Sequence, residues 1–222
     1  MRTKLVQGIH DFEKNAFAER RELFERLANV GQSPDALFIT CSDSRVVPNL
    51  ITSSEPGDLF IVRNVGNCVG PPYLPGSTAA ALEYAVKVLE VEDIILCGHT
   101  GCGAMKAILD PSSLEELPYL RTWLVATERV RTIIDTRYPD LDEASRVTAA
   151  VLENVLVQLE NLRAFDFVSE RIAAGALRLS GWVFDIQSGK THYYDPNEGE
   201  FLPLVEDGGE PLPRRRGDAT TP

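Results

Sequence analysis

Two cysteines and one histidine have the residue types and the spacing of a metal site. His99 and Cys102 lie three residues apart on a short glycine-containing segment, and Cys41 lies earlier, at the end of an apolar run. Catalytic zinc takes three protein ligands and keeps a fourth position for water. Two thiolates and one imidazole form a soft donor set that favours zinc over magnesium or calcium. We therefore predict a zinc site formed by Cys41, His99 and Cys102, in preference to three unrelated packing residues.

Asp43 and Arg45 follow the first of these cysteines and are separated by one residue. In an extended turn their side chains could point the same way. A carboxylate beside an open zinc site either accepts a hydrogen bond from bound water or takes the open position itself. An adjacent guanidinium favours the first arrangement, because it can hold the carboxylate bidentately. The alternative is a surface salt bridge that contributes little.

Three short apolar runs, 36–40, 59–62 and 94–97, each end where polar residues begin. Continuous apolar strands of this length are typical of a parallel sheet that is buried on both faces. Helical segments separate them, one starting near Ser77 and another near Gly103. Ligands of such sheets bind beyond the carboxyl ends of the strands, where the candidate ligands lie. The sequence predicts an α/β fold with a central, mostly parallel sheet flanked by helices.

The two ends of the chain differ in character. Ala16, Leu23, Leu27 and Val30 recur at helical spacing, which predicts a projecting helical arm over 1–31. Apolar positions 123–133 and 151–162 predict helices in the second half, and 177–186 alternates like a strand before a hairpin turn at 187–190. We expect one domain over 1–195, followed by a loosely held Pro/Gly-rich tail over 196–222, acidic and then basic.

The amino-acid composition argues against several classes of protein, among them nucleic-acid binders, membrane proteins and disulfide scaffolds. The 222 residues carry a formal net charge of −11, which disfavours nucleic-acid binding. A hydrophobic fraction of 44% with no run of 18 apolar residues indicates a globular chain with no membrane partner. The first residues show no apolar targeting segment, and the four cysteines are too few for a disulfide scaffold. We expect a cytoplasmic protein in which clustered cysteines bind metal.

Three sequence blocks resemble the signature blocks of the β-class carbonic anhydrases. They are Cys41–Arg45, Arg63–Asn67 and Cys97–Gly103, and they occur in the family's order on predicted strand ends. The likeness is strong from Gln32 to Met105 and looser as far as Trp182.

The resemblance implies the reversible hydration of carbon dioxide to bicarbonate and a proton by zinc-bound hydroxide, with one Zn²⁺ per chain. It implies that Cys41, His99 and Cys102 bind zinc, and that Asp43 and Arg45 orient the hydroxide. It also implies that five residues border the substrate: Gln32, the apolar walls Phe60, Val65 and Tyr84, and the backbone amide of Gly103. A homodimer or homotetramer is expected, with the N-terminal helix packed on a neighbouring subunit.

Alternatives remain within and outside this family. Some members close the site by placing the aspartate on zinc, and these carry a tryptophan three residues before the first ligand. Phe38 occupies that position here, although Arg63 of the same cluster is present, so we expect an open site. Some relatives hydrolyse carbonyl sulfide or carbon disulfide instead. A zinc-stabilised, non-catalytic assembly subunit is the alternative of a different class.

Overall fold

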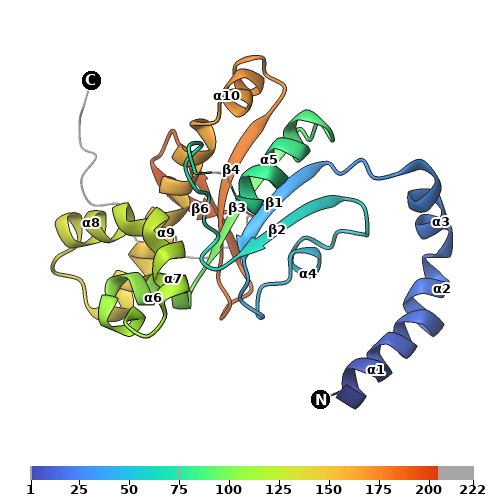
Figure 1. Cartoon of the computed structure of the whole chain (residues 1–222), viewed down its shortest axis with the longest axis horizontal. Helices are drawn as coiled ribbons and strands as arrows, with labels where there is room; N and C mark the ends of the chain where they lie inside the picture. Colours follow the sequence, from blue (N-terminus) through green and yellow to red (C-terminus); the bar gives the residue numbers. More distant parts are fainter. Residues whose placement is uncertain (1, 75, 205–222) are drawn as a thin grey trace.

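A six-stranded sheet forms the centre of the computed structural model, which describes residues 2–74 and 76–204 (Figure 1). The strand order is β2-β1-β3-β4-β5-β6. The strands are β1 Ala36–Cys41, β2 Leu59–Asn64, β3 Asp93–His99, β4 Arg178–Phe184, β5 Thr191–Asp195 and β6 Glu200–Pro203. The first four strands pair in parallel, and β5 and β6 are added antiparallel. The predicted mostly parallel α/β sheet is therefore confirmed.

The register of the parallel strands brings three chain segments to one edge of the sheet. Cys41 at the end of β1 pairs with Asn64 of β2, and Thr40 pairs with Cys97 of β3. Every residue of the central strand β1 is buried, and most of β3 is buried, whereas the edge strand β2 is only partly buried. Because β1 lies between β2 and β3, the segments that follow these three strands leave the sheet as neighbours.

Helices connect and cover the strands. In chain order they are α4 Pro48–Thr52, α5 Ser77–Lys87, α6 Gly103–Leu109, α7 Pro118–Trp123, α8 Glu128–Arg137, α9 Glu143–Arg163 and α10 Asp166–Ala173. The carboxylate of Asp142 caps α9 by accepting a hydrogen bond of 2.8 Å from the Ser145 amide. A Cβ atom at Gly98 would lie 2.9 Å from Val155 of α9, so glycine lets this helix pack closely on β3.

The helix predicted over 123–133 is interrupted. Residue 123 ends α7, a 3₁₀ turn covers Leu124–Thr127, and α8 begins only at Glu128. The Thr127 hydroxyl donates a 2.6 Å hydrogen bond to the Leu124 carbonyl, which satisfies that oxygen outside a regular α-helical ladder. Of the predicted apolar face, Val130 is buried but Trp123 is 38% exposed, because the turn rotates α7 relative to α8.

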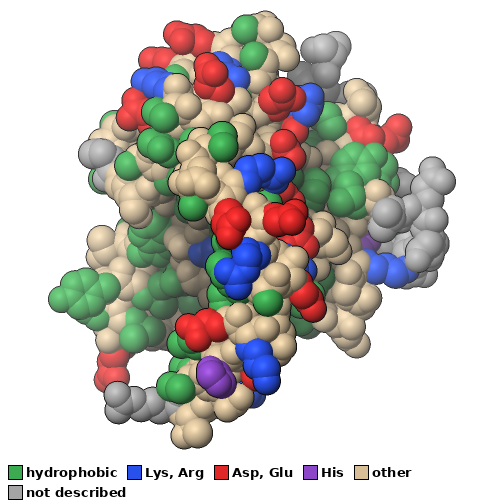
Figure 2. All heavy atoms as spheres, turned by 90° about the vertical axis from the view of Figure 1, so that its right-hand side faces the viewer, with side chains coloured by type: hydrophobic (Ala, Val, Ile, Leu, Met, Phe, Trp, Pro, Cys, Tyr) green, Lys and Arg blue, Asp and Glu red, His purple; other side chains and the backbone are tan. Residues whose placement is uncertain are grey.

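The N-terminal arm is helical, as predicted, and extends away from the sheet (Figure 1). It consists of α1 Arg2–Asp11, a π-helical turn Phe12–Ala16, α2 Phe17–Glu19 and α3 Arg21–Val30. Figure 2 shows this side of the molecule, with acidic and basic side chains interspersed and apolar side chains exposed beside them. Leu5, Val6 and Ile9 of α1 are at least 60% exposed, so the arm has an apolar face that the described part of the chain leaves uncovered.

The C-terminal part differs from the expected tail. The hairpin turn predicted at 187–190 is confirmed between β4 and β5, with Gly189 in the left-handed region at φ +73°. A second turn follows, and Glu200–Pro203 forms β6 instead of a loose segment, because β5 offers it a free edge for pairing. The prediction of a loosely held tail from residue 196 is therefore wrong for the residues of β6. The remainder of the predicted tail, 205–222, lies outside the described residues. No helix among the described residues is long and apolar enough to cross a membrane.

Candidate metal centre

The three predicted ligands lie where elements of secondary structure end or begin. Cys41 is the last residue of β1, His99 is the last residue of β3, and Cys102 directly precedes α6. The carboxyl ends of β1 and β3 are neighbours because these strands are adjacent and parallel. The three potential donor atoms lie within 4.8 Å of one another, and all three residues are buried. The structure therefore brings the complete predicted ligand set together.

His99 presents one ring nitrogen to this group. Its Nδ1 atom lies 3.0 Å from the Thr100 carbonyl oxygen, which can only accept, so Nδ1 carries the proton. The Nε2 lone pair is left free, and this buried atom has no hydrogen-bond partner among the residues that the structure describes. A buried polar atom without a partner is costly, and a metal cation would satisfy it. The donor set thus fits zinc in both atom type and tautomer.

The two sulfur atoms share a polar environment. The pKa of Cys41 lies below that of an ordinary thiol, first because the Cys102 thiol donates a hydrogen bond to its sulfur. The Gly66 amide adds a hydrogen bond to the same sulfur at 3.4 Å. The pKa of Cys102 is raised, first by its hydrogen bond to Cys41 and then by burial. A divalent cation would stabilise both sulfurs as thiolates.

Asp43 and Arg45 form a bidentate pair beside these ligands. Arg45 Nε lies 2.9 Å from Asp43 Oδ1, and Arg45 Nη2 lies 2.8 Å from Asp43 Oδ2. The Arg45 guanidinium holds the pKa of Asp43 well below its usual range, so the carboxylate is ionised and can only accept hydrogen bonds. Asp43 Oδ2 also lies 3.8 Å from His99 Nε2. The pair therefore faces the donor set instead of standing apart on the surface.

Backbone contacts hold the segment that carries this pair. Arg63, on β2, donates to the Cys41 carbonyl at 3.2 Å and to the Asp43 carbonyl at 2.7 Å. Arg45 Nη2 reaches the Gly101 carbonyl at 3.3 Å, which links the segment after β1 to the segment after β3. These bonds fix the carboxylate relative to both ligand-bearing strands.

The five predicted substrate residues fall into two groups. Val65, which directly follows β2, and Gly103, which starts α6, adjoin the metal centre, and the space where a Cβ atom of Gly103 would project is open. Phe60 pairs instead with Leu37, four residues before Cys41, or about 13 Å along the strand. Its ring lies 5.8 Å from that of Tyr84, which is 44% exposed. Gln32 is exposed and precedes β1, so the chain does not bring these three residues to its own metal centre.

A buried polar ladder on α9 was missed by the sequence analysis. Asn154 donates to the Gly66 carbonyl at 3.0 Å, and Gln158 accepts from the Val69 amide at 2.8 Å. Asn161 donates to the Val69 carbonyl at 2.8 Å. The ladder holds the loop after β2, whose Gly66 amide reaches Cys41. Its signal was present as polar residues at helical spacing within an otherwise apolar helix.

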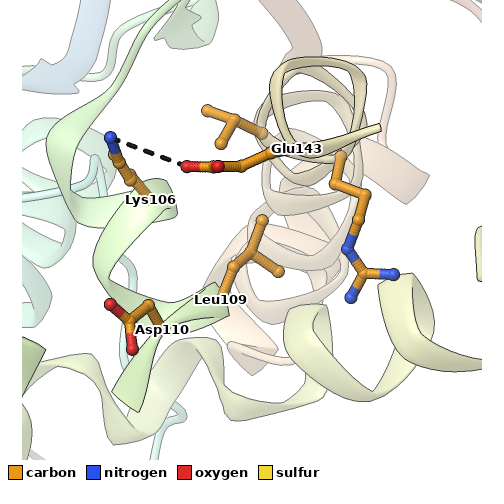
Figure 3. Close-up of a pocket in the computed structure, with 6 residues that line it drawn as sticks. Lys106, Leu109, Asp110 and Glu143 are labelled. Atoms are coloured by element: carbon orange, nitrogen blue, oxygen red, sulfur yellow. Dashed lines mark ion pairs between the residues drawn. The ribbon is translucent and has the colours of Figure 1, made fainter. Parts of the chain in front are cut away.

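The two larger cavities among the described residues lie outside the cluster of donor atoms. One, of about 400 Å³, opens between α6 and α9, where Lys106 and Glu143 point toward one another at 3.7 Å (Figure 3). Its two basic and two acidic lining residues balance, so it offers no excess charge to a ligand. The other, of about 800 Å³, is mainly apolar and extends from the loop after β2 to α7.

Fold and site together define a zinc-dependent enzyme built on a mostly parallel sheet. The family model for carbonic anhydrases matches residues 36–191. The chain is 46% identical to a carbonic anhydrase of Synechocystis sp. over 90% of its own length and 73% of that protein. It is 44% identical to a carbonic anhydrase of Pseudomonas aeruginosa, covering 93% of this chain and 96% of that one.

Solved structures agree with these sequence relatives. The β-carbonic anhydrase CcaA superposes with a TM-score of 0.89 at 43% identity and covers 92% of both chains. One of two tetrameric β-carbonic anhydrases from Sordaria macrospora gives a TM-score of 0.79 at 32% identity, covering 86% of this chain and 95% of that one. The chain belongs to the β-class carbonic anhydrase family, whose members use zinc to hydrate carbon dioxide.

Proposed function

We propose that this chain hydrates carbon dioxide reversibly to bicarbonate and a proton, with Asp43 and Arg45 orienting the attacking oxygen. One observation carries the assignment of roles. The Asp43 carboxylate, held at both oxygens by Arg45, lies 3.8 Å from the ring nitrogen of His99 that faces the donor set. A structural zinc site needs no such group, because its four ligands close the coordination sphere.

Each residue has a defined task in this mechanism. Cys41, His99 and Cys102 would hold zinc, which would lower the pKa of bound water to about 7 and so supply a nucleophile at neutral pH. Asp43 accepts a hydrogen bond from the proton of the attacking oxygen, which directs a lone pair toward the substrate. Arg45 keeps Asp43 ionised and oriented. Val65 offers apolar surface to carbon dioxide, and the Gly103 amide can donate to a substrate oxygen.

We further propose that the resting site is open, with Asp43 off the metal. Both Asp43 oxygens already accept hydrogen bonds from Arg45, and moving the carboxylate would break them. Phe38, in the position where closed members carry tryptophan, is fully buried in β1 and packs edge-on against Trp182 with ring centroids 6.1 Å apart. The phenyl ring of Phe38, smaller than the indole of the closed members, supports an open resting site.

Stopped-flow hydration of carbon dioxide by the zinc-loaded protein, from about pH 6.5 to about pH 9, tests both proposals. Turnover should rise smoothly through a pKa near 7. Activity that starts abruptly only at alkaline pH would contradict the open site. A zinc-loaded protein without turnover at any pH would contradict the hydratase, and carbonyl sulfide and carbon disulfide would then be tested as substrates.

We propose that Gln32, Phe60 and Tyr84 act at the metal centre of a second copy of this chain. Phe60 and Tyr84 pack together toward the start of the strands, at the end of the sheet that Gln32 precedes. The Asp35 amide donates to the Asp58 carbonyl at 3.0 Å, so the segments before β1 and β2 lie together there. Gln32 and Tyr84 are exposed and Phe60 is half-buried beside Tyr84, which supports one group that a partner could contact.

We therefore propose that the chain assembles into a homodimer or homotetramer. The apolar face of α1 supports the same conclusion, because exposed apolar residues in a row favour burial against another surface. The related Sordaria macrospora enzymes are described as tetrameric. Sedimentation velocity at micromolar concentration measures the assembly directly, and a monomer would contradict the proposal.

We propose the cytoplasm as the location. All four cysteines are free and buried, which suits a reducing compartment. Fractionation of cells that express the tagged chain tests this, and recovery outside the cytoplasm would contradict it.

A further inference from the structure

The peptide that joins Val65 to Gly66 links the metal centre to α7. Its N–H donates to the Cys41 sulfur at 3.4 Å. Its carbonyl, on Val65, accepts a 2.7 Å hydrogen bond from Nε1 of Trp123, the last residue of α7. The same peptide plane is therefore held at both ends, by the indole on one side and by the ligand sulfur on the other.

The backbone at this peptide has little freedom to change. Gly66 has a φ of +81°, in the left-handed region, and a Cβ atom there would lie 3.0 Å from the Ala104 Cβ atom. Asn154 of α9 donates to the Gly66 carbonyl at 3.0 Å and so holds the next peptide. The hydrogen bond from Trp123 differs from these contacts because its donor side chain is accessible. Trp123 is 38% exposed and lines the apolar cavity.

We propose that Trp123 is a positioning residue for the metal centre, which aims the Gly66 amide at the Cys41 thiolate and strengthens that hydrogen bond. A carbonyl that accepts a short hydrogen bond polarises its own peptide, so the N–H becomes a better donor. A hydrogen bond to a ligand sulfur tunes how strongly that sulfur binds a metal, and losing such an outer partner typically costs 10–100-fold in affinity. No part of the catalytic step involves Trp123 directly.

Trp123→Phe removes the indole N–H and keeps an aromatic ring. Zinc affinity is measured by competition with a chromophoric chelator, and we expect it to fall about 10-fold. Cobalt in place of zinc gives sulfur-to-metal charge-transfer bands, and we expect these to move to longer wavelength because the thiolate loses hydrogen bonding. Trp182→Phe is the matched control, because its indole bonds to Ser180 at 2.9 Å on β4 instead.

A second variant separates the hydrogen bond from packing. In the Trp182→Phe background, Trp123 is replaced by 3-benzothienylalanine, which keeps the bicyclic shape and has sulfur in place of N–H. It should reproduce both the affinity loss and the band shift. Unchanged affinity and bands in either variant, whatever the thermal stability, would overturn the proposal. The inference rests on the zinc site of the proposed function but not on turnover, so a zinc-binding protein that fails to hydrate carbon dioxide would overturn that function alone.

Discussion

The metal centre and the group formed by Gln32, Phe60 and Tyr84 are built in opposite ways. The metal ligands are at most 5% exposed, come from the ends of two adjacent strands and the loop after the second, and are held by hydrogen bonds within the chain. Tyr84 is 44% exposed, Gln32 is exposed, and both lie away from the ligands. A parallel sheet places groups at one edge with high precision, but it cannot bring residues from its opposite end to that edge. One chain therefore completes the metal centre, and we propose that another supplies the substrate side.

The largest effect is expected at a ligand. Cys41→Ser should remove zinc and lower carbon dioxide hydration by well over about 100-fold, beyond the range of outer-shell changes, because serine is a poor ligand for this soft site. Metal content by mass spectrometry and stopped-flow rates measure the two losses. Cys97→Ala, at a buried cysteine outside the ligand set, is the control and should retain zinc. Full activity of zinc-free Cys41→Ser protein would contradict the metal centre.

The second effect concerns orientation without loss of metal. Asp43→Asn keeps the size of the side chain but weakens its hold on Arg45 and presents a donor where an acceptor is needed. We expect roughly 100-fold slower hydration with zinc content unchanged. Glu55→Gln is a matched control, because Glu55 pairs with Arg20 of the arm at 2.6 Å and does not approach the ligands. If the Asp43→Asn protein hydrated carbon dioxide at the wild-type rate, the proposed catalytic role of Asp43 and Arg45 would be wrong.

A third, smaller effect tests the substrate side. Gln32→Ala combined with Tyr84→Ala should cost about 2 kcal/mol of transition-state stabilisation, or about 30-fold in rate, from one lost hydrogen bond and one lost apolar wall. Zinc affinity should not change, because neither residue contacts a ligand. Parallel measurement of kcat/KM and metal binding separates this group from the metal centre.

Hybrid assemblies sharpen the same comparison. A dimer with one Cys41→Ser chain and one chain that lacks Gln32 and Tyr84 contains one intact site if the two groups meet across chains. Differently tagged subunits allow its purification, and about half of the wild-type activity is expected. If both groups served the same chain, neither site would be intact. Only the chain that lacks Gln32 and Tyr84 would then turn over, so the hybrid would show about half the activity of that variant, roughly 60-fold below the wild type.

The smallest effect on the single chain is expected at the arm. Val6→Ser combined with Ile9→Ser should change the free energy of unfolding by less than about 0.5 kcal/mol, because both side chains are exposed. Assembly should nevertheless weaken, as measured by sedimentation velocity over a dilution series. Lys4→Ser is the control on the same helix. An unchanged assembly would show that the apolar face of α1 is not an interface.

Sequence reasoning was most reliable where one strand carries both packing and chemistry. The runs that became β1, β2 and β3 were recognised from continuous apolar residues, and the ligands from soft donors at their ends. It failed at β6, because the Pro/Gly-rich composition after residue 195 was interpreted as a loose tail, whereas 196–199 form a hairpin turn that leads into a strand of only four residues. It also missed Asn154, Gln158 and Asn161, because apolar spacing marks α9 as buried but does not show which backbone groups need partners.

Residue identity alone determined the metal chemistry of this protein, since thiolate, imidazole and carboxylate keep their preferences in any fold. The tertiary structure decided which of those groups meet. It placed Cys41, His99 and Cys102 within 4.8 Å of one another and turned Nε2 of His99 toward them. It also kept Gln32, Phe60 and Tyr84 apart from them. The physical reason is that strand pairing sets distances across the sheet, and spacing along the chain does not contain that information.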